Sequence, residues 1–475
     1  MIRRLIPLCL PAIILNCTTP PALQHPDPPA GLPEMWTALA TTDGLPASLA
    51  TDAQWWTSMG DERLAALVEE GLAHNHDLAA AVARVDRAVA AARIAGATTL
   101  PQIQAGGDAS RNKRNFIGFP IPGGGGSTTT TTYKATLSAS WELDLWGRLR
   151  SGAAKAIADA QAAAADLAGA RLSLQAKIVR AFYNAIDSRL QVELLEATTN
   201  NLEVSTLQIR ARYERGLRPS FDVRLAESNL AGTRAALALR RRAHDTAVRQ
   251  LELLLGRYPA AEIEISEQLP PMPQAIPSGL PAQLVSRRPD LAAAERRLVA
   301  ADLLLGEARR ALLPRISLTG SAGRSSEDLG DLLDGDFAVW NLIGNITMPL
   351  FQGGRLRRQV DAAVAGKEQE IASYAQRVLT AFAEVEQALV AEQLLTEQEA
   401  ALRIASRQAA AAERLSQHRY RHGLSDLIAY LDAQRRTFEA RSQLLTVQRQ
   451  RLEARVSLHV ALGGGFRFDN PPDNS

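Results

Sequence analysis

The stretch Asp77-Leu78-Ala79-Ala80-Ala81 returns in the same chain as Asp290-Leu291-Ala292-Ala293-Ala294, at an offset of 213 residues. Leu100-Pro101 and Leu313-Pro314 keep this offset, whereas Gly147-Arg148-Leu149-Arg150 and Gly354-Arg355-Leu356-Arg357 are 207 residues apart. Two constant offsets with a single step between them indicate that the chain contains an internal duplication.

The step between the two offsets marks the place where the copies differ in length. It lies between Arg111 and Gly147 and predicts a loop that is six residues longer in the first copy. The glycine run at 123–126 suggests that this loop has a mobile tip. The copies are predicted to span 55–256 and 283–463, with a proline-rich linker at 257–282 and a tail at 464–475.

Each copy is predicted to contain a helix, a pair of strands and a long helical hairpin. Pro101 and Pro314 end the first helices, and no proline interrupts the long ones. Helices of this length bury their seams against each other as coiled coils. The predicted first helices are 62–99 and 289–312, the strand pairs 101–146 and 314–351, and the long helices 151–215 and 356–421, with return helices ending at Gly256 and Gly463.

The strand pairs alternate apolar and polar residues with a period of two. Such strands present one apolar face and one polar face, which suits a strand between lipid and a wet lumen. Two soluble hairpins, each with one buried face, would show the same local pattern, so this alternative stays open. Four large side chains near the strand ends suit an interfacial girdle, namely Trp141, Trp146, Trp340 and Phe351.

The amino terminus is predicted to be a targeting segment, with a signal peptide at 1–16. Arg3 and Arg4 precede a short apolar stretch that ends before Cys17. This arrangement resembles the lipobox of bacterial lipoproteins, in which the cysteine is acylated. Asn16 replaces the usual small residue, so an ordinary signal peptide with an incidental cysteine is the alternative. Residues 17–54 are then predicted to be a lipid anchor and an extended segment.

The composition argues against several classes of protein. The chain has 475 residues, a formal net charge of +2 and no cysteine beyond Cys9 and Cys17. It therefore has no overall attraction to nucleic acid and cannot form a disulfide framework in its body. His74 and His76, like His418 and His422, lack a third metal ligand or a zinc-enzyme pattern. We therefore predict no metal, no cofactor and no enzymatic activity.

Four membrane strands per chain would be too few to form a closed barrel, since about eight is the smallest number observed. Open sheet edges are not tolerated in lipid. If these strands cross a membrane, the protein must therefore oligomerise, with the helical hairpins extending the barrel on one side.

Several motifs together resemble one known family. They are Pro289-Asp290-Leu291, Leu313-Pro314, Pro349-Leu350-Phe351 with Gly353-Gly354-Arg355, Tyr420-Arg421-His422-Gly423, and Leu431-Asp432-Ala433-Gln434. The chain resembles an outer-membrane factor of the TolC-like superfamily, in the NodT-like lipoprotein branch found with RND-type efflux pumps. The resemblance implies a mixed, mostly α fold. It also implies a homotrimer with a twelve-stranded barrel, four strands from each chain, and a periplasmic tunnel of coiled-coil helices.

The same resemblance implies partners and a function. The partners are a periplasmic adaptor (membrane fusion) protein, an inner-membrane RND-type pump and outer-membrane lipid. The predicted function is passive export of small molecules, such as drugs, toxic compounds or metal ions, across the outer membrane of a Gram-negative cell. The alternatives are a channel for type I protein secretion and a periplasmic coiled-coil tether that spans no membrane.

The resemblance also implies a periplasmic aperture near the turn of the second helical hairpin. Asp432 matches the family's acidic ring, and Ile428 could add an apolar constriction one helical turn earlier. Tyr420 and Arg435 match positions that hold the closed state through polar contacts between helices. The alternatives are a solvated helix charge for Asp432 and packing in the helical seam for Tyr420.

Overall fold

A computed structural model describes residues 36–37, 54–115, 127–273, 284 and 287–466. The chain divides into two compact units, which we treat separately. The first unit holds the sheet and the helical segments next to it, from Val85–Ala163 and Ala294–Tyr374. The second unit holds the helical hairpins, mainly from Ala164–Ala293 and Ala375–Ser475.

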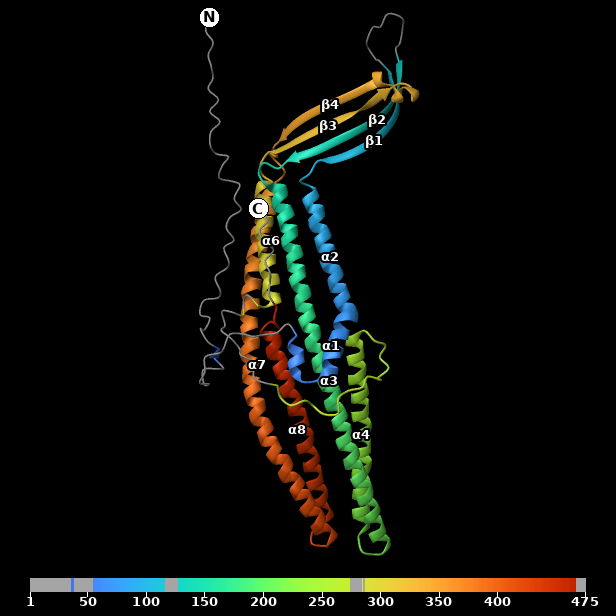
Figure 1. Cartoon of the computed structure of the whole chain (residues 1–475), viewed down its shortest axis with the longest axis vertical. Helices are drawn as coiled ribbons and strands as arrows, with labels where there is room; N and C mark the ends of the chain where they lie inside the picture. The colour runs from blue at the N-terminus through green and yellow to red at the C-terminus, as the bar shows by residue number, and fades with distance from the viewer. Residues whose placement is uncertain (1–35, 38–53, 116–126, 274–283, 285–286, 467–475) are drawn as a thin grey trace, which may run out of the picture. The chain divides into compact units, whose positions relative to one another are not determined.

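The first unit contains one four-stranded sheet with the order β1-β2-β3-β4 (Figure 1). Every neighbouring pair is antiparallel. Because β2 of the first copy pairs with β3 of the second, the two predicted strand pairs merge into a single sheet. The strands are β1 (Gln102–Asn115), β2 (Ser127–Leu143), β3 (Arg315–Ser326) and β4 (Ala338–Thr347).

Helices make up most of the remaining described chain, which confirms the mostly α fold (Figure 1). Among the described residues, no helix is both long enough and apolar enough to cross a lipid bilayer. The helices are α1 (Glu62–His74), α2 (His76–Ala97), α3 (Arg148–Glu214), α4 (Ser220–Leu255), α6 (Pro289–Arg310), α7 (Arg355–Arg421) and α8 (Leu427–Ala461), with short 3-10 turns η3 (Trp55–Met59), η4 (Gly330–Leu333) and η5 (Gly335–Phe337).

The prediction of one helix over 62–99 is wrong, because Asn75 separates α1 from α2. Its backbone is extended, and its side-chain amide donates to the Leu254 carbonyl at 2.9 Å. The Asn75 side-chain oxygen accepts from the backbone N–H of Leu78 at 2.9 Å, which caps the start of α2. Asparagine at this position therefore ends one helix and begins the next.

The six additional residues of the first copy lie in the strands, so the prediction of a longer loop is also wrong. At the repeat offsets, β1 continues two residues beyond the end of β3, and β2 begins four residues before β4. The connecting segments 116–126 and 327–337 have equal lengths. The glycine run at 123–126 lies outside the described residues.

Glycine is required at the ends of the two return helices for the same structural reason in both copies. Gly256 and Gly463 have positive φ angles of 78° and 91°. A Cβ atom at these positions would lie 2.4 Å from the His74 carbonyl oxygen and 2.0 Å from that of Arg287. His74 and Arg287 are themselves equivalent in the repeat. The duplication thus preserves one close backbone approach, which only glycine permits.

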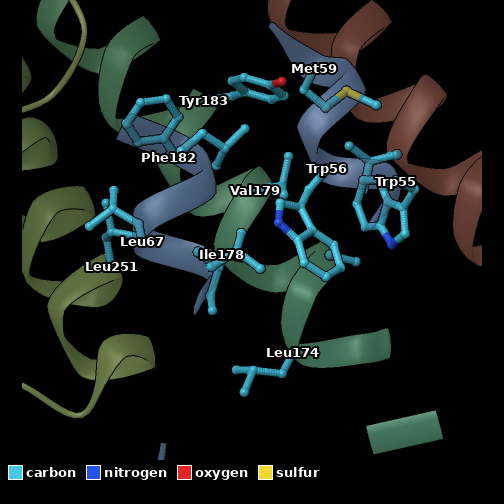
Figure 2. Packing of buried hydrophobic residues seen from close by; sticks show 14 of the residues in the cluster. Trp55, Trp56, Met59, Leu67, Leu174, Ile178, Val179, Phe182, Tyr183 and Leu251 are labelled. Atoms are coloured by element: carbon cyan, nitrogen blue, oxygen red, sulfur yellow. The ribbon is translucent and has the colours of Figure 1, made fainter. Parts of the chain in front are cut away.

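The main hydrophobic core of the second unit forms where η3, α1, α3, α4 and α8 meet (Figure 2). Trp55 is fully buried, donates from its indole nitrogen to Gln175 at 3.1 Å and stacks on the His459 ring with 4.9 Å between centroids. Phe182 and Tyr183 of α3 are also fully buried. These aromatic side chains bury large apolar surfaces and so stabilise the packing of these helices against one another.

An ion cluster around the buried Arg288 explains the Arg288-Pro289-Asp290 motif. The Arg288 guanidinium donates to Asp290 at 2.8 and 3.0 Å, to Glu384 at 2.6 Å and to the Ala461 carbonyl at 3.2 Å. Burial of the Arg288 guanidinium costs solvation free energy, and these bonds offset that cost. The motif therefore starts α6 and also ties it to α7 and α8.

The buried His459 makes stability depend on pH. Burial first, and the nearby Arg455 second, lower the pKa of His459 to about 4. The unfolded chain binds a proton below pH 6.5, whereas the folded protein binds it only near pH 4. We expect the free energy of unfolding to fall by about 3 kcal/mol from this group between pH 6.5 and 4.

Urea unfolding at several pH values tests this effect. His459→Gln should lose most of this pH dependence, and His76→Gln, which changes an exposed histidine, should keep it. An unchanged pH dependence in His459→Gln would contradict the assignment.

Candidate channel-forming surfaces

The four strands place their apolar side chains on one face of the sheet. In the observed register, Ile103 pairs with Ala139, which pairs with Gly320, which in turn pairs with Leu342. Because side chains alternate along each strand, the residues two positions away join the same face. This apolar face comprises Ile103, Ala105, Gly107, Ala109, Tyr133, Ala135, Leu137, Ala139, Trp141, Leu143, Ile316, Leu318, Gly320, Ala322, Trp340, Leu342, Gly344 and Ile346.

The described part of the chain leaves much of this apolar face uncovered. Trp340 is 81% exposed, Ile346 75% and Leu342 65%. A contiguous apolar surface of this kind marks contact with a partner or a membrane. Two soluble hairpins would bury this face within the chain, so the exposure favours membrane strands over the soluble alternative.

The opposite face of the sheet is mainly polar. Ser138 pairs with Gln104 on one side and with Ser321 on the other. Asn341 accepts from the backbone and the hydroxyl of Ser321, both at 3.0 Å. Ile343, which breaks the alternation of β4, lies on this polar face and pairs with Thr319. The polar face is therefore suited to water.

The predicted aromatic girdle separates into two kinds of residue. Trp141 and Trp146 donate from their indole nitrogens to the carbonyls of Thr99 and Pro314, at 2.9 and 2.7 Å. They thereby fasten the strand ends to the neighbouring loops. Trp340 and Phe351 are largely exposed. An aromatic ring near a strand end suits the boundary between lipid and water, and the indole of Trp340 also has a polar N–H.

The turns of the two helical hairpins meet in the second unit in a small hydrophobic cluster, here called the turn cluster. It contains Ile209, Ala226, Tyr420, Leu427 and Tyr430. The Tyr420 and Tyr430 rings are nearly parallel, with centroids 5.9 Å apart. The hydroxyl of Tyr430 lies 3.3 Å from Gln417 and 3.4 Å from Ser205. The turn cluster thus joins α3 and α4 to α7 and α8.

Tyr420 also carries a contact between the hairpins. The Arg218 guanidinium, in the turn between α3 and α4, lies 4.8 Å from the centre of the Tyr420 ring. Such cation–π contacts are stabilising when they are partly desolvated. Burial raises the pKa of Tyr420, and its hydroxyl has no hydrogen-bond partner among the described residues. The ring of Tyr420, more than its hydroxyl, therefore holds the turns together within the chain.

Asp432 lies on the exposed side of α8 with two cationic neighbours. It accepts from Arg435 and from Arg436, both at 2.7 Å, and these bonds lower the pKa of the carboxyl group. Arg435 also donates to Glu439 at 2.7 Å. Asp432 and Arg435 thus pair within α8, and the described contacts of Arg435 do not reach another helix.

A groove of about 440 Å³ runs between α3, α4 and α8 beside these residues. Ile428, which is 56% exposed, lines it together with Asp432 and Arg435. Sequence reasoning did not single out Arg218 or Arg436. The spacing of four residues between Asp432 and Arg436 in a helix does predict an ion pair. The contact of Arg218 with Tyr420 depends on the packing of two hairpins and has no such local pattern.

A protein-family model described as outer membrane efflux protein matches residues 67–257 and 280–464. The chain belongs to this family. The two matched ranges follow the duplication, and the outer membrane efflux fold accounts for the two-faced sheet and for the helical hairpins. The resemblance to the TolC-like outer-membrane factor superfamily is therefore confirmed, whereas the lipoprotein branch stays a prediction.

Relatives in this family share most of their length with the chain. The pyoverdine export outer membrane protein OpmQ of Pseudomonas putida is 32% identical over 98% of each chain. The toluene efflux pump outer membrane protein TtgF of Pseudomonas putida is 33% identical, covering 97% of this chain and 96% of TtgF. The CmeC outer membrane channel of Campylobacter jejuni aligns with a TM-score of 0.87 and 25% identity, over 93% of this chain and 94% of CmeC.

These similarities confirm the predicted role as an outer-membrane efflux channel. They favour this role over a tether that spans no membrane. Cys17 and the rest of the predicted lipobox lie outside the described residues, so acylation stays a prediction.

The two faces of the sheet should respond differently to charge. Leu342→Arg would place a guanidinium on the apolar face, where a charge near the middle of the bilayer costs about 2–4 kcal/mol. We expect this variant to reduce the amount of protein assembled in the outer membrane, measured by fractionation and immunoblotting.

The adjacent Ile343→Arg is a matched control, because it changes an aliphatic residue on the polar face of the same strand. It should assemble close to the wild-type level. Equal losses in the two variants would show that the faces are not distinguished by lipid.

Proposed function

We propose that the protein is the outer-membrane channel subunit of a tripartite efflux system and acts as a homotrimer. In this system it receives small molecules from a periplasmic adaptor and an inner-membrane RND-type pump. The observation that carries the proposal is the open, two-faced sheet, with an apolar face left exposed and a polar face suited to a wet lumen. Such a sheet in lipid has to be completed by other chains.

The open edges of the sheet support an oligomer, and the family resemblance implies that it is a trimer. Within the described part of the chain, β1 and β4 each pair on one side only, so each leaves a row of backbone N–H and C=O groups unpaired. In hydrocarbon each unpaired group would cost several kcal/mol. Three copies joined through β1 and β4 would close twelve strands and satisfy both edges in every chain.

We infer that the cargo is small and that its identity is not fixed by the fold. One relative is named for pyoverdine and another for toluene, although both are about equally similar to this chain. A polar sheet face with serine, threonine and asparagine side chains selects little beyond compatibility with water.

The N-terminal segment is proposed to anchor the protein through acylated Cys17. Trp36 is buried and packs on Phe382 of α7, with 5.7 Å between the ring centroids. The Thr37 N–H donates to Glu386 at 2.6 Å. These contacts support a segment that is held against the second unit twenty residues after the predicted acylation site.

Asp432, Ile428, Tyr420 and Arg435 are proposed to form the periplasmic aperture. Tyr420 and Arg218 hold the hairpin turns together, and Asp432 carries charge on the exposed side of α8. Arg435 and Arg436 counter that charge locally. A threefold ring built this way would close both through packing of the turns and through the charge balance set by Asp432, Arg435 and Arg436.

A double variant tests this aperture. Asp432→Ala with Tyr420→Phe should increase single-channel conductance in a planar bilayer by about twofold or more, and should admit larger solutes, because the charge ring is removed. Tyr420→Phe alone should stay near the wild-type conductance, since the hydroxyl has no partner among the described residues.

The same recordings test the proposed function itself. The wild-type protein should be extracted from outer membranes as a heat-modifiable trimer and should conduct ions. A protein that purifies without detergent and never conducts would overturn the channel. Unchanged conductance in the double variant would overturn only the aperture assignment.

A further inference from the structure

A second groove lies in the first unit, beside α6. Its volume is about 810 Å³, within the range of pockets that hold small molecules. Residues of α3, α6 and α7 line it, and Arg315 at the start of β3 lies at its edge. None of the features discussed above uses this groove, here called the α6 groove.

The α6 groove opens on the side of the polar sheet face. Arg315 has the same parity along β3 as Ser317, Thr319 and Ser321, so it belongs to that face. Glu142 of β2 also lies on the polar face and binds Arg148, a residue lining the groove, at 2.9 and 3.0 Å. The groove therefore faces the side that is suited to water and not the apolar side.

The α6 groove has a positive excess, because five basic side chains and three acidic ones line it, namely Arg148, Lys155, Arg297, Arg315 and Arg355 against Asp159, Glu307 and Glu370. Two of its cations are matched by acids, because Lys155 binds Asp159 at 2.8 Å and Arg148 binds Glu142. Arg315 is exposed and makes no ion pair among the described residues. Arg355 is exposed as well, and its described side-chain partner is the neutral Gln352, at 2.6 Å. Two guanidinium groups are thus available to an anion.

The floor of the α6 groove is apolar. The floor contains Ala300, Ala301 and Ala308 of α6 and Ala311 just after it, and Leu304 lies among them with 40% of its surface exposed. Alanine side chains leave room above the helix, and the apolar surface favours a ligand with a hydrocarbon or aromatic body. The groove therefore combines an apolar floor with a cationic rim.

We propose that the α6 groove binds soluble organic anions that carry an apolar or aromatic body, with Arg315 and Arg355 binding the acidic group. Guanidinium groups bind carboxylates and sulfonates through charge-assisted, geometrically matched hydrogen bonds. The amino-terminal ends of α3 and α7, at Arg148 and Arg355, add a positive dipole at the same end of the groove. The role of this site in transport rests on the proposed channel function. In such a channel, the site would favour anionic cargo.

Binding can be measured without relying on transport. The full-length protein is placed in phosphatidylcholine nanodiscs, which contain no anionic lipid, and titrated with naphthalene-2-sulfonate by calorimetry. We expect saturable binding to the wild type, and at least about tenfold weaker binding to Arg315→Gln with Arg355→Gln, because charge-assisted bonds are lost. The cation 2-naphthylmethylammonium should bind much more weakly than the sulfonate.

Two further variants keep the result interpretable. Arg358→Gln removes an exposed α7 arginine that does not line the groove and pairs with Asp361, so binding should be unchanged. Ala308→Leu fills the groove while keeping its charges and should also weaken binding. Equal affinity in wild type, Ala308→Leu and the double arginine variant would overturn the proposal, as would equal binding of the cation.

Single-channel recordings of the same preparations separate this proposal from the channel. If the protein conducts ions but all variants bind the sulfonate equally well, the channel proposal is supported and the anion-site proposal is refuted. If the protein binds the sulfonate through Arg315 and Arg355 but does not conduct ions, the channel proposal is refuted and the anion site is supported.

Discussion

Unsatisfied backbone groups at the two sheet edges are the constraint on which the rest of the molecule depends. The outer edges of β1 and β4 cannot pair with each other within one chain, because four strands are too few to close a barrel. Lipid offers no hydrogen bonds, so a sheet with one apolar face and two open edges has to be completed by identical neighbours. The exposed apolar side chains and the open edges thus have the same explanation: a single chain contributes only part of a larger barrel.

The duplication supplies the sheet with matched halves. β2 and β3 come from different copies, and their pairing converts two hairpins into one continuous sheet. The same duplication is visible in the second unit, where Gly256 and Gly463 each permit a close approach to the backbone of the preceding segment. The copies differ mainly in the length of their strands. A repeated unit can therefore build both a sheet and a helical wall while keeping its turns and helix ends.

Charge is handled differently in different parts of the chain. Near the hairpin turns, Asp432 is countered by arginines of its own helix, and aromatic packing of Tyr420 links the hairpins. Beside α6, in contrast, Arg315 and Arg355 have no described carboxylate partner. An exposed guanidinium costs little to leave unpaired in water, so such residues are available for a passing anion.

The sequence by itself determined the duplication, the two faces of each strand, the long helices and the family, because local periodicity and fixed offsets record them directly. The family motifs in the sequence also led to the residues that are proposed for the aperture. The tertiary structure decided the β2–β3 pairing, the helix break at Asn75 and the contact of Arg218 with Tyr420. Each joins residues about 170 to 200 apart in the chain, as Leu143 and Ile316, Asn75 and Leu254, and Arg218 and Tyr420 do. Contacts between such distant segments depend on packing and leave no local pattern to read.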